Sequence, residues 1–312
     1  MVTSALIPAP KTYLGWAVDY TAPPGEPGFA APGSVSWRVF KNPVALAIGG
    51  VAAVLLEFAD PRIRSGVWDH STFRTDPVGR SARTGIAAMV GVFGPQSAAR
   101  RIIRGVTHMH ANVAGVTPGG ERYHALDAEL LDWVSATAAY GFVTAYDRFA
   151  APLGDDAQAG FFTEGQAVAR LYGATSPIGS HQDFNAMLDR LLPRFEPHDI
   201  NTQFLSIMAS GRAAPAVPRG LHSALVNAAV DILPGEVRER LELGRAFDLT
   251  PRGRSTVKAM ARIADRVPDL KSPAAQASAR LGLPRSFPWR SGRTQARWLA
   301  RAGWTGKTVA AP

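Results

Sequence analysis

The stretch PQSAARRIIRGVTHMHANVAG, residues 95–115, decides the fold because its apolar positions recur at helical spacing and end at a histidine. The residues three or four positions apart on one face are Ala99, Ile103, Val106, His110 and Val113. The opposite face is polar and carries Arg101, Arg104, His108 and Asn112. We therefore predict that His110 turns toward the core, where its ring nitrogens need hydrogen bonds or a metal, while His108 turns toward water.

Apolar residues recur at helical spacing in the rest of the chain as well, so the sequence predicts an all-α fold. Asp60 before Pro61 and Asp76 before Pro77 are typical helix starts, and Asp127 is expected to cap a third long helix. Residues 117–123 are expected to form a turn or a short hairpin. Further helices are expected over residues 157–172, 180–192, 201–210, 221–233 and 235–243.

The 312 residues, 46% of them apolar and 19% charged, suit one large multi-helix globular domain. We predict an extended N-terminal arm over 1–34, a helical domain over 35–250, and a basic, proline-containing region over 251–312. The first 32 residues lack the pattern of a signal peptide. The apolar run at 43–56 is too short to cross a bilayer and is interpreted as a buried helix.

Charge and cysteine content exclude several function classes. The chain has no cysteine, which leaves histidine and carboxylates as its strong metal ligands and excludes thiolate haem ligation and iron–sulfur clusters. The net charge is +9, but residues 252–312 hold 13 Lys/Arg against 2 Asp/Glu, whereas the remainder holds 21 against 23. A near-neutral body argues against a nucleic-acid enzyme, and we expect a cytoplasmic protein.

The C-terminal region has two interpretations. Arg293, Arg297 and Arg301 repeat every four residues as a basic helical stripe, and three tryptophans lie nearby, at positions 289, 298 and 304. Basic residues beside tryptophans suit peripheral contact with an anionic membrane surface. The plainer interpretation is a solvated or disordered tail.

Between residues 36 and 149 the chain carries a series of short blocks: 55–61 (LLEFADP), 66–73 (GVWDHSTF), 76–84 (DPVGRSART), 92–94 (VFG), 109–115 (MHANVAG), 123–127 (YHALD) and 130–134 (LLDWV). In this order the blocks resemble the catalytic domain shared by MpaB-type oxygenases and bacterial rubber oxygenases (latex-clearing proteins). The resemblance implies haem b, with its iron held by His110 as the proximal ligand in a pocket between core helices.

The resemblance also places Arg80 and Thr84, four apart on one helix face, at the border of the haem. Arg83 falls where relatives have a lysine that caps the iron from the distal side. An arginine stays protonated and cannot ligate iron, so the distal position would be open or held by water. The alternative is that Arg80 and Arg83 are ordinary surface residues of a first helical turn.

Other candidate residues have simpler alternatives. Glu57 ends an apolar helix, where a buried carboxylate can act as a base or pair with Arg80. His70 is expected either to line the cofactor pocket or to bond to backbone. Many relatives carry histidine where this chain has Asp60 and Ser135, and Asp60 is expected to serve as a helix cap. The remaining histidines, which are His124, His181, His198 and His222, are expected at the surface.

These features favour a haem b-dependent oxygenase that uses O2 on an apolar, isoprenoid-like or otherwise unsaturated, lipid-like substrate. No Gly-x-Ser-x-Gly elbow points to a serine hydrolase. Two alternatives stay open. One is a haem-binding protein without oxygenase turnover, and the other is a cofactor-free helical interaction protein in which His110 is a satisfied core residue.

Overall fold

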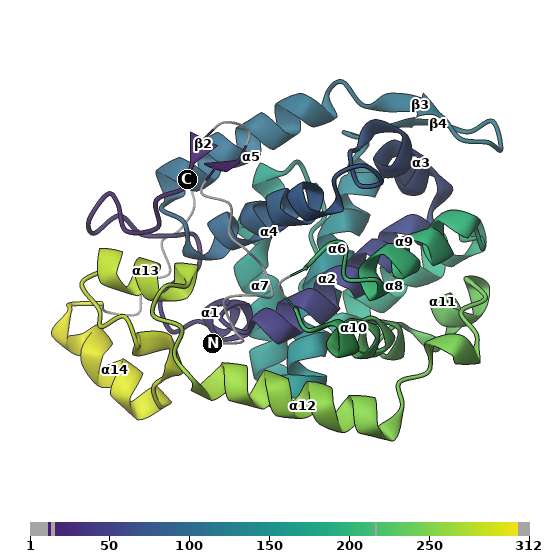
Figure 1. The fold of residues 1–312 in the computed structure, drawn as a ribbon. Coiled ribbons are helices and arrows are strands. Elements are labelled where there is room, and N and C mark those ends of the chain that lie inside the picture. The colour runs from purple at the N-terminus through teal and green to yellow at the C-terminus, as the bar shows by residue number, and fades with distance from the viewer. Residues whose placement is uncertain (1–11, 14–15, 216, 305–312) are drawn as a thin grey trace.

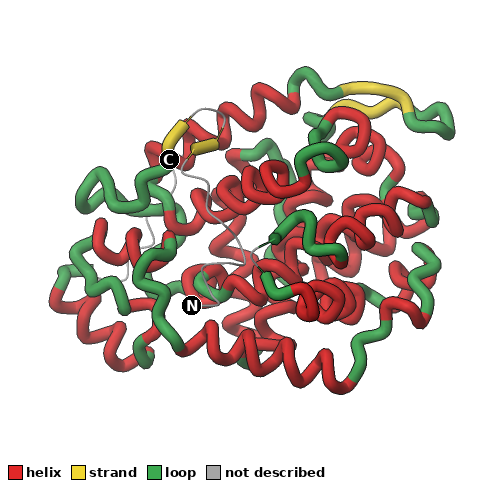
Figure 2. Tube along the Cα trace, viewed as in Figure 1, coloured by secondary structure: helices red, strands yellow, loops and turns green. Residues whose placement is uncertain are grey.

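The computed structural model describes residues 12–13, 16–215 and 217–304, and helices dominate this part of the chain (Figure 1). Figure 2 shows the strands confined to two small hairpins, so the predicted all-α class is confirmed. The α-helices of the described residues are α1 (Val35–Phe40), α2 (Pro43–Ala59), α3 (Pro61–His70), α4 (Pro77–Phe93), α5 (Gln96–His110), α6 (Ala128–Ala145), α7 (Asp155–Leu171), α8 (His181–Leu191), α9 (Asp199–Ala209), α10 (Arg219–Asp231), α11 (Gly235–Arg240), α12 (Pro251–Arg266), α13 (Pro273–Arg280) and α14 (Gly292–Arg301).

The shorter elements connect these helices. They are the strand pairs β1 (Thr12–Tyr13) with β2 (Trp16–Ala17) and β3 (Ala114–Val116) with β4 (Arg122–His124), the π-helix η2 (Tyr146–Ala150), and the 3-10 turns η3 (Leu192–Arg194), η4 (Arg245–Phe247) and η5 (Phe287–Trp289). The antiparallel β3–β4 pair confirms the hairpin expected around residues 117–123.

Helix α2 is the central element of the core, and the side chains of most of its residues are buried. Asn42 caps its start by accepting hydrogen bonds from the backbone N–H groups of Val44 and Ala45. Gly49 lies against Gly141 of α6, where a Cβ added to Gly49 would stand 2.6 Å from the Gly141 carbonyl oxygen. The glycine pair therefore lets the two helix backbones approach more closely than any larger residue would allow.

Two of the three predicted helix caps are confirmed. The Asp60 side chain accepts from Arg62 N at 2.9 Å, and the Asp76 side chain accepts from Gly79 N at 2.8 Å. The prediction for Asp127 was wrong in its chemistry. Its carboxylate accepts a hydrogen bond from the backbone N–H of His124 at 3.0 Å. Asp127 therefore stabilises the turn that follows β4 and does not cap α6 with its side chain.

The chain segments on either side of the predicted helical domain pack on it where they are described. The guanidinium of Arg280 is buried and donates to the carbonyls of Tyr20, Glu26 and Phe93 at 2.8 to 2.9 Å. These bonds tie the N-terminal segment to α13 and to the end of α4. The boundaries at 34 and 250 stay predictions, and residues 1–11 of the expected arm and 305–312 of the basic region lie outside the described residues.

The C-terminal helix α14 separates its basic and aromatic residues. The arginine stripe at 293, 297 and 301 is exposed. Trp298, in contrast, is half-buried, packs against the core and contacts the Phe287 ring at a centroid distance of 6.3 Å. Trp289 donates its indole N–H to Ala264 O. These two tryptophans therefore turn away from the arginine stripe, which leaves that stripe without the apolar partner that the membrane interpretation used.

Within the described residues no single helix has both the length and the apolar character needed to cross a membrane. One pair, α2 with α3, passes the same test together, although the two helices meet at an angle of 112°.

Candidate functional site

The C-terminal turn of α2 is held by groups from several other segments, and this fixes the position of Glu57. Helix ends leave their last carbonyls without helical partners, and buried carbonyls need other donors. Here the Leu56 oxygen accepts from Trp133 Nε1 (3.1 Å), that of Glu57 from Asp60 N (3.2 Å), that of Phe58 from Arg64 Nη1 (3.2 Å) and that of Ala59 from Glu196 N (3.3 Å). The position of this helix end is thus set by side chains and backbone from α3, α6 and the loop before α9.

Glu57 is half-buried, and its carboxyl lies between α2 and α6. Its Oε1 accepts a hydrogen bond from Thr137 Oγ1 of α6 at 3.3 Å. Burial raises the pKa of Glu57 to about 7, against the lowering effects of the Arg80 charge and the Thr137 hydrogen bond. Glu57 can therefore hold or release a proton near neutral pH.

Arg80 and Thr84 face one another on the first turns of α4, as their spacing predicts. The Arg80 guanidinium donates to Thr84 Oγ1, and the Thr84 hydroxyl donates to the Arg80 carbonyl at 3.1 Å. Asp76 and Pro77 start the helix just before them. The positive charge of Arg80 acts on Glu57 and also on His110, so residues from α2, α4 and α5 lie in one electrostatic neighbourhood.

His110 is the last residue of α5, and the predicted faces of this helix are confirmed. Ala99, Ile103 and Val106 are buried, whereas His108 is exposed on the opposite side. His110 itself is half-buried, and its Nδ1 is a buried nitrogen without a hydrogen-bond partner among the described residues. Burial, followed by the charge of Arg80, lowers the pKa of the His110 ring, which favours the neutral imidazole.

The structure places Arg83 and His70 on contacts of their own. The Arg83 guanidinium donates to Thr72 Oγ1 at 2.6 Å and lies 3.7 Å from Asp76 Oδ2, in the segment between α3 and α4. His70 is exposed, and its Nε2 is 3.3 Å from the hydroxyl of Tyr123 on β4.

Asp60 has a structural role in this chain. It is fully buried, caps α3 and pairs with Arg62 through both oxygens at 3.0 and 2.7 Å. Arg62 in turn reaches Glu129 at 2.8 Å. Among the residues that the structure describes, no group of three or more His, Cys, Asp or Glu side chains could hold a metal ion together.

Two further features were missed by the sequence analysis. Thr137 contacts Glu57, and its only signal was its place four residues after Trp133, on the same face of α6. His222, expected at the surface, is buried and bonds to Val217 O at 3.0 Å. Its spacing of three and four residues from Leu225 and Val226, which are also buried, was an available sign.

The site combines a neutral histidine, a carboxyl group with a raised pKa and an arginine. These groups come from three core helices of one helical domain. The comparisons with known proteins agree with the blocks noted above. Residues 37–266 match the family described as ER-bound oxygenase mpaB/B'/Rubber oxygenase, catalytic domain. The chain belongs to this family. No curated protein and no solved structure matched it.

Family membership supports an oxygenase role for the protein and, with it, the oxidoreductase class. All the residues of the converging group, Glu57, Arg80, His110 and Thr137, lie inside the matched range.

Proposed function

We propose that the protein is a haem b-dependent oxygenase in which His110 ligates the iron and the substrate is an apolar, unsaturated molecule. The observation that carries this proposal is the buried Nδ1 of His110, which has no hydrogen-bond partner in the described part of the chain and belongs to a ring that burial keeps neutral. A neutral imidazole on a helix is the usual protein ligand of haem iron, and its other nitrogen needs a hydrogen-bond acceptor. Haem b, when bound, supplies iron that binds and activates O2.

Arg80 and Thr84 suit the polar border of such a group. A guanidinium is a rigid fork of donors that matches carboxylates, which haem b carries at its edge. The contact between Arg80 and Thr84 holds the guanidinium against α4 while its charge extends toward His110 and Glu57. We assign to Arg80 the binding and orienting of the anionic edge. Arg83, held by Thr72 and Asp76, has no part in this assignment.

Glu57 is the group that can move a proton. With a pKa of about 7 it is partly protonated in neutral solution, which suits a general acid or base. The Thr137 hydroxyl lies 3.3 Å from Oε1, and it can accept the proton of the neutral carboxyl there while it donates its own proton to Val134 O at 2.9 Å. Glu57 can thus give a proton to a reacting oxygen, or take one, while Thr137 keeps the carboxyl in one orientation.

The apolar substrate class rests on the family and on the aromatic surroundings of α2. Phe58, which follows Glu57, contacts Trp68 and Phe204 with ring centroids 6.3 and 5.5 Å apart, and Phe73 joins the same cluster. Such surroundings favour hydrocarbon over charged substrates. Cleavage of a carbon–carbon double bond by O2 into two carbonyl groups balances without a further reductant. We infer this reaction type from the family resemblance.

The test is an absorption spectrum of the protein after reconstitution with haem, alongside His110→Ala and the matched control His108→Ala. We expect a Soret band in the wild type and in His108→Ala, and its loss or a strong shift in His110→Ala. The control removes an imidazole from the exposed face of the same helix two residues away. A Soret band that is unchanged in His110→Ala would rule out His110 as the ligand.

Oxygen uptake separates the proposed oxygenase from the other two functions. We expect the haem-loaded protein to consume O2 with an isoprenoid alkene and to form carbonyl products. A Soret band without such uptake would indicate a haem-binding protein without oxygenase turnover. If the wild type takes up no haem at all, haem dependence is wrong and a cofactor-free role becomes the better account.

A further inference from the structure

Three exposed apolar side chains gather at the end of α12. Five large apolar side chains of the described residues are largely exposed, and three of these lie within one short stretch: Ile263, Val267 and Leu270, at 59, 52 and 49%. Ile263 and Val267 are four residues apart and share one face of the helix end, and Leu270 follows in the segment that leads to α13. Apolar side chains that gather at such exposure often mark a binding surface.

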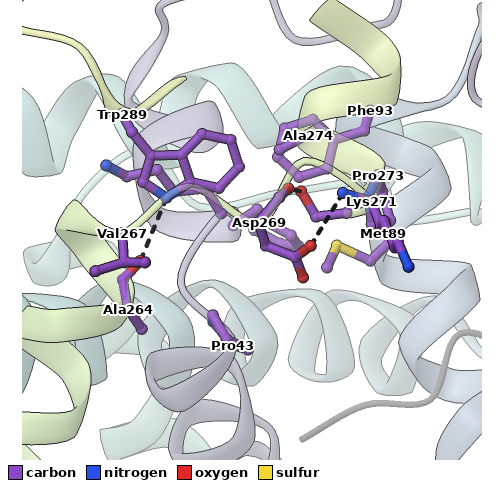
Figure 3. A pocket seen from close by; sticks show the side chains of 13 residues that line it. Pro43, Met89, Phe93, Ala264, Val267, Asp269, Lys271, Pro273, Ala274 and Trp289 are labelled. Carbon is purple, nitrogen blue, oxygen red and sulfur yellow. Dashed lines mark hydrogen bonds between the residues drawn. The ribbon is translucent and has the colours of Figure 1, made fainter. Parts of the chain in front are cut away.

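The backbone at this end of α12 is held by side chains from other segments, which donate to its carbonyl oxygens. These bonds are Asn42 Nδ2 to Ala261 O (2.9 Å), Lys41 Nζ to Asp265 O (2.8 Å) and Trp289 Nε1 to Ala264 O (3.3 Å). Figure 3 shows the last of them beside Val267. The inner face of α12 is thus anchored, and the opposite face is fixed toward solvent.

A cavity beside these residues continues the apolar surface inward. It measures about 90 Å³ and opens between the start of α2, the end of α4 and the segment that joins α12 to α13 (Figure 3). Val267 lines it together with Met89, Phe93 and Trp289. The apolar area at this end of α12 is therefore larger than the three exposed side chains alone.

Basic side chains surround the exposed apolar residues. The exposed cations are Arg262, Arg266, Lys271 and Arg285, and none of them forms an ion pair with a carboxylate of the described residues. Each of the two α12 arginines directly precedes an apolar residue of the surface, so basic and apolar side chains form adjacent stripes. Arg285 reaches the same segment by donating to the Leu270 oxygen at 3.3 Å.

The two carboxylates of this segment do not neutralise the four cations. The Asp265 carboxylate lies 3.3 Å from Lys41 Nζ, on a side chain that is only 6% exposed, and it also accepts from the Tyr146 hydroxyl. Asp265 is therefore matched inside the protein. Asp269 is the remaining acidic residue, and its Oδ1 accepts from the backbone N–H of Lys271 at 3.0 Å. Four exposed cations against this one carboxylate leave three positive charges in excess around the apolar side chains.

This combination is complementary to an anionic membrane surface. Arginine and lysine have long apolar stems, so their charged ends can stay among lipid phosphates while neighbouring apolar side chains enter the boundary of the acyl chains. Each cation near an anionic leaflet adds to the attraction. A bilayer also accepts protruding apolar side chains without a matching groove, which a protein partner would have to place opposite them.

We propose that the end of α12 binds the surface of an anionic lipid bilayer from one side, without crossing it. Ile263, Val267 and Leu270 enter the headgroup boundary, and the four exposed cations face the lipid phosphates. The arginine stripe of α14 is not part of this surface, because it carries no exposed large apolar side chain. The proposal does not depend on haem binding or on oxygenase activity.

The test is sedimentation of the whole protein with vesicles of phosphatidylcholine and phosphatidylglycerol in equal parts. We expect the wild type to sediment with these vesicles and to stay in solution with phosphatidylcholine alone. Binding should weaken as the salt concentration rises, because salt screens the cations. Arg262→Gln combined with Arg266→Gln should weaken binding about twenty-five-fold, since each cation contributes about fivefold. Ile263→Gln should weaken it about tenfold.

Two matched controls remove the same chemistry from other parts of the surface. Arg101→Gln combined with Arg104→Gln removes two exposed charges from α5, which lies at the opposite edge of the molecule from α12 in Figure 1. Val116→Gln removes an apolar side chain that is 57% exposed on β3. Both controls should bind the vesicles as the wild type does. All these changes are at exposed positions, so thermal melting by circular dichroism should match the wild type.

Three vesicle results would overturn the proposal: equal binding to phosphatidylcholine alone, unchanged binding in Ile263→Gln, or an equal loss in the α5 control. Sedimentation velocity without lipid tests whether a second copy of the chain covers the surface instead. We expect a single species that Ile263→Gln does not change. A dimer that Ile263→Gln disperses, together with no vesicle binding, would mean that this surface joins two copies and does not meet a membrane.

Discussion

The raised pKa of Glu57 predicts that Glu57→Gln changes how the stability of the protein depends on pH. In the folded protein the pKa is about 7, whereas the ordinary value of 4.5 applies to the unfolded chain. Between these values the folded protein keeps a proton that the unfolded chain has released. Stability therefore falls as pH rises from 4.5 through 7, and above 7 the full cost of the buried charge is present.

The size of the effect follows from the two pKa values. A difference between 4.5 and about 7 corresponds to about 3 kcal/mol of unfolding free energy, as an upper value. Glutamine is neutral at every pH and its amide oxygen can still accept from Thr137. Glu57→Gln should therefore match the wild type near pH 4.5 and exceed its stability by up to about 3 kcal/mol at pH 8.

Urea unfolding at pH 5, 6, 7 and 8 measures the difference between the two proteins at each pH. Glu236→Gln serves as the control, because it removes the same charge from an exposed position on α11. We expect its difference from the wild type to stay within a few tenths of a kcal/mol. If the curves of the wild type and Glu57→Gln remain parallel from pH 5 to pH 8, the buried carboxyl with a raised pKa does not exist.

Three further predictions concern packing and charge. Gly49→Ala should lower the free energy of unfolding by at least about 2 kcal/mol, because the new Cβ meets the backbone of α6. Gly50→Ala should raise it by about 0.5–1 kcal/mol, because the nearest atom to the new Cβ is a side-chain atom at 3.9 Å. The melting temperatures of the two variants test both expectations. Asn201→Leu should stabilise the protein by about 1–2 kcal/mol in urea unfolding, since both side-chain amide atoms are buried and have no hydrogen-bond partner among the described residues; a loss of stability would mean that the amide is satisfied. Arg80→Met should raise the pKa of His110 in an NMR titration, and an unchanged value would place the two side chains out of electrostatic reach.

Local sequence predicted much of the candidate site because its residues are marked by near neighbours. The faces of α5 follow from the recurrence of apolar residues, which placed His110 inward and His108 outward before any fold was considered. The start of α4 follows from Asp76 and Pro77, and this start sets Arg80 and Thr84 on one face. Glu57 was marked by its position at the end of a long apolar run.

Other parts of the site depend on contacts between distant segments, which no local pattern encodes. Thr137 reaches Glu57 because α6 lies along α2, and that packing in turn depends on Gly49 and Gly141. Asp127 satisfies every local criterion of a cap, yet its carboxylate bonds to His124 because the hairpin places that N–H within reach. Which hydrogen-bond partner a side chain takes, one in its own helix or one from another segment, is decided only in the folded protein, where both partners are within reach.

The helical class, the caps at Asp60 and Asp76 and the faces of α5 follow from the sequence, because helix geometry converts spacings of three or four residues directly into faces and ends. Arg80 and the ligand role of His110 entered the candidate set through the family resemblance. Packing of distant segments decides that the charge of Arg80 reaches both Glu57 and His110, that Trp298 turns inward, and that a cavity opens at the far end of α2. Such features require that specific faces of distant helices pack against one another. This packing creates the burial that raises the pKa of Glu57 and keeps His110 neutral.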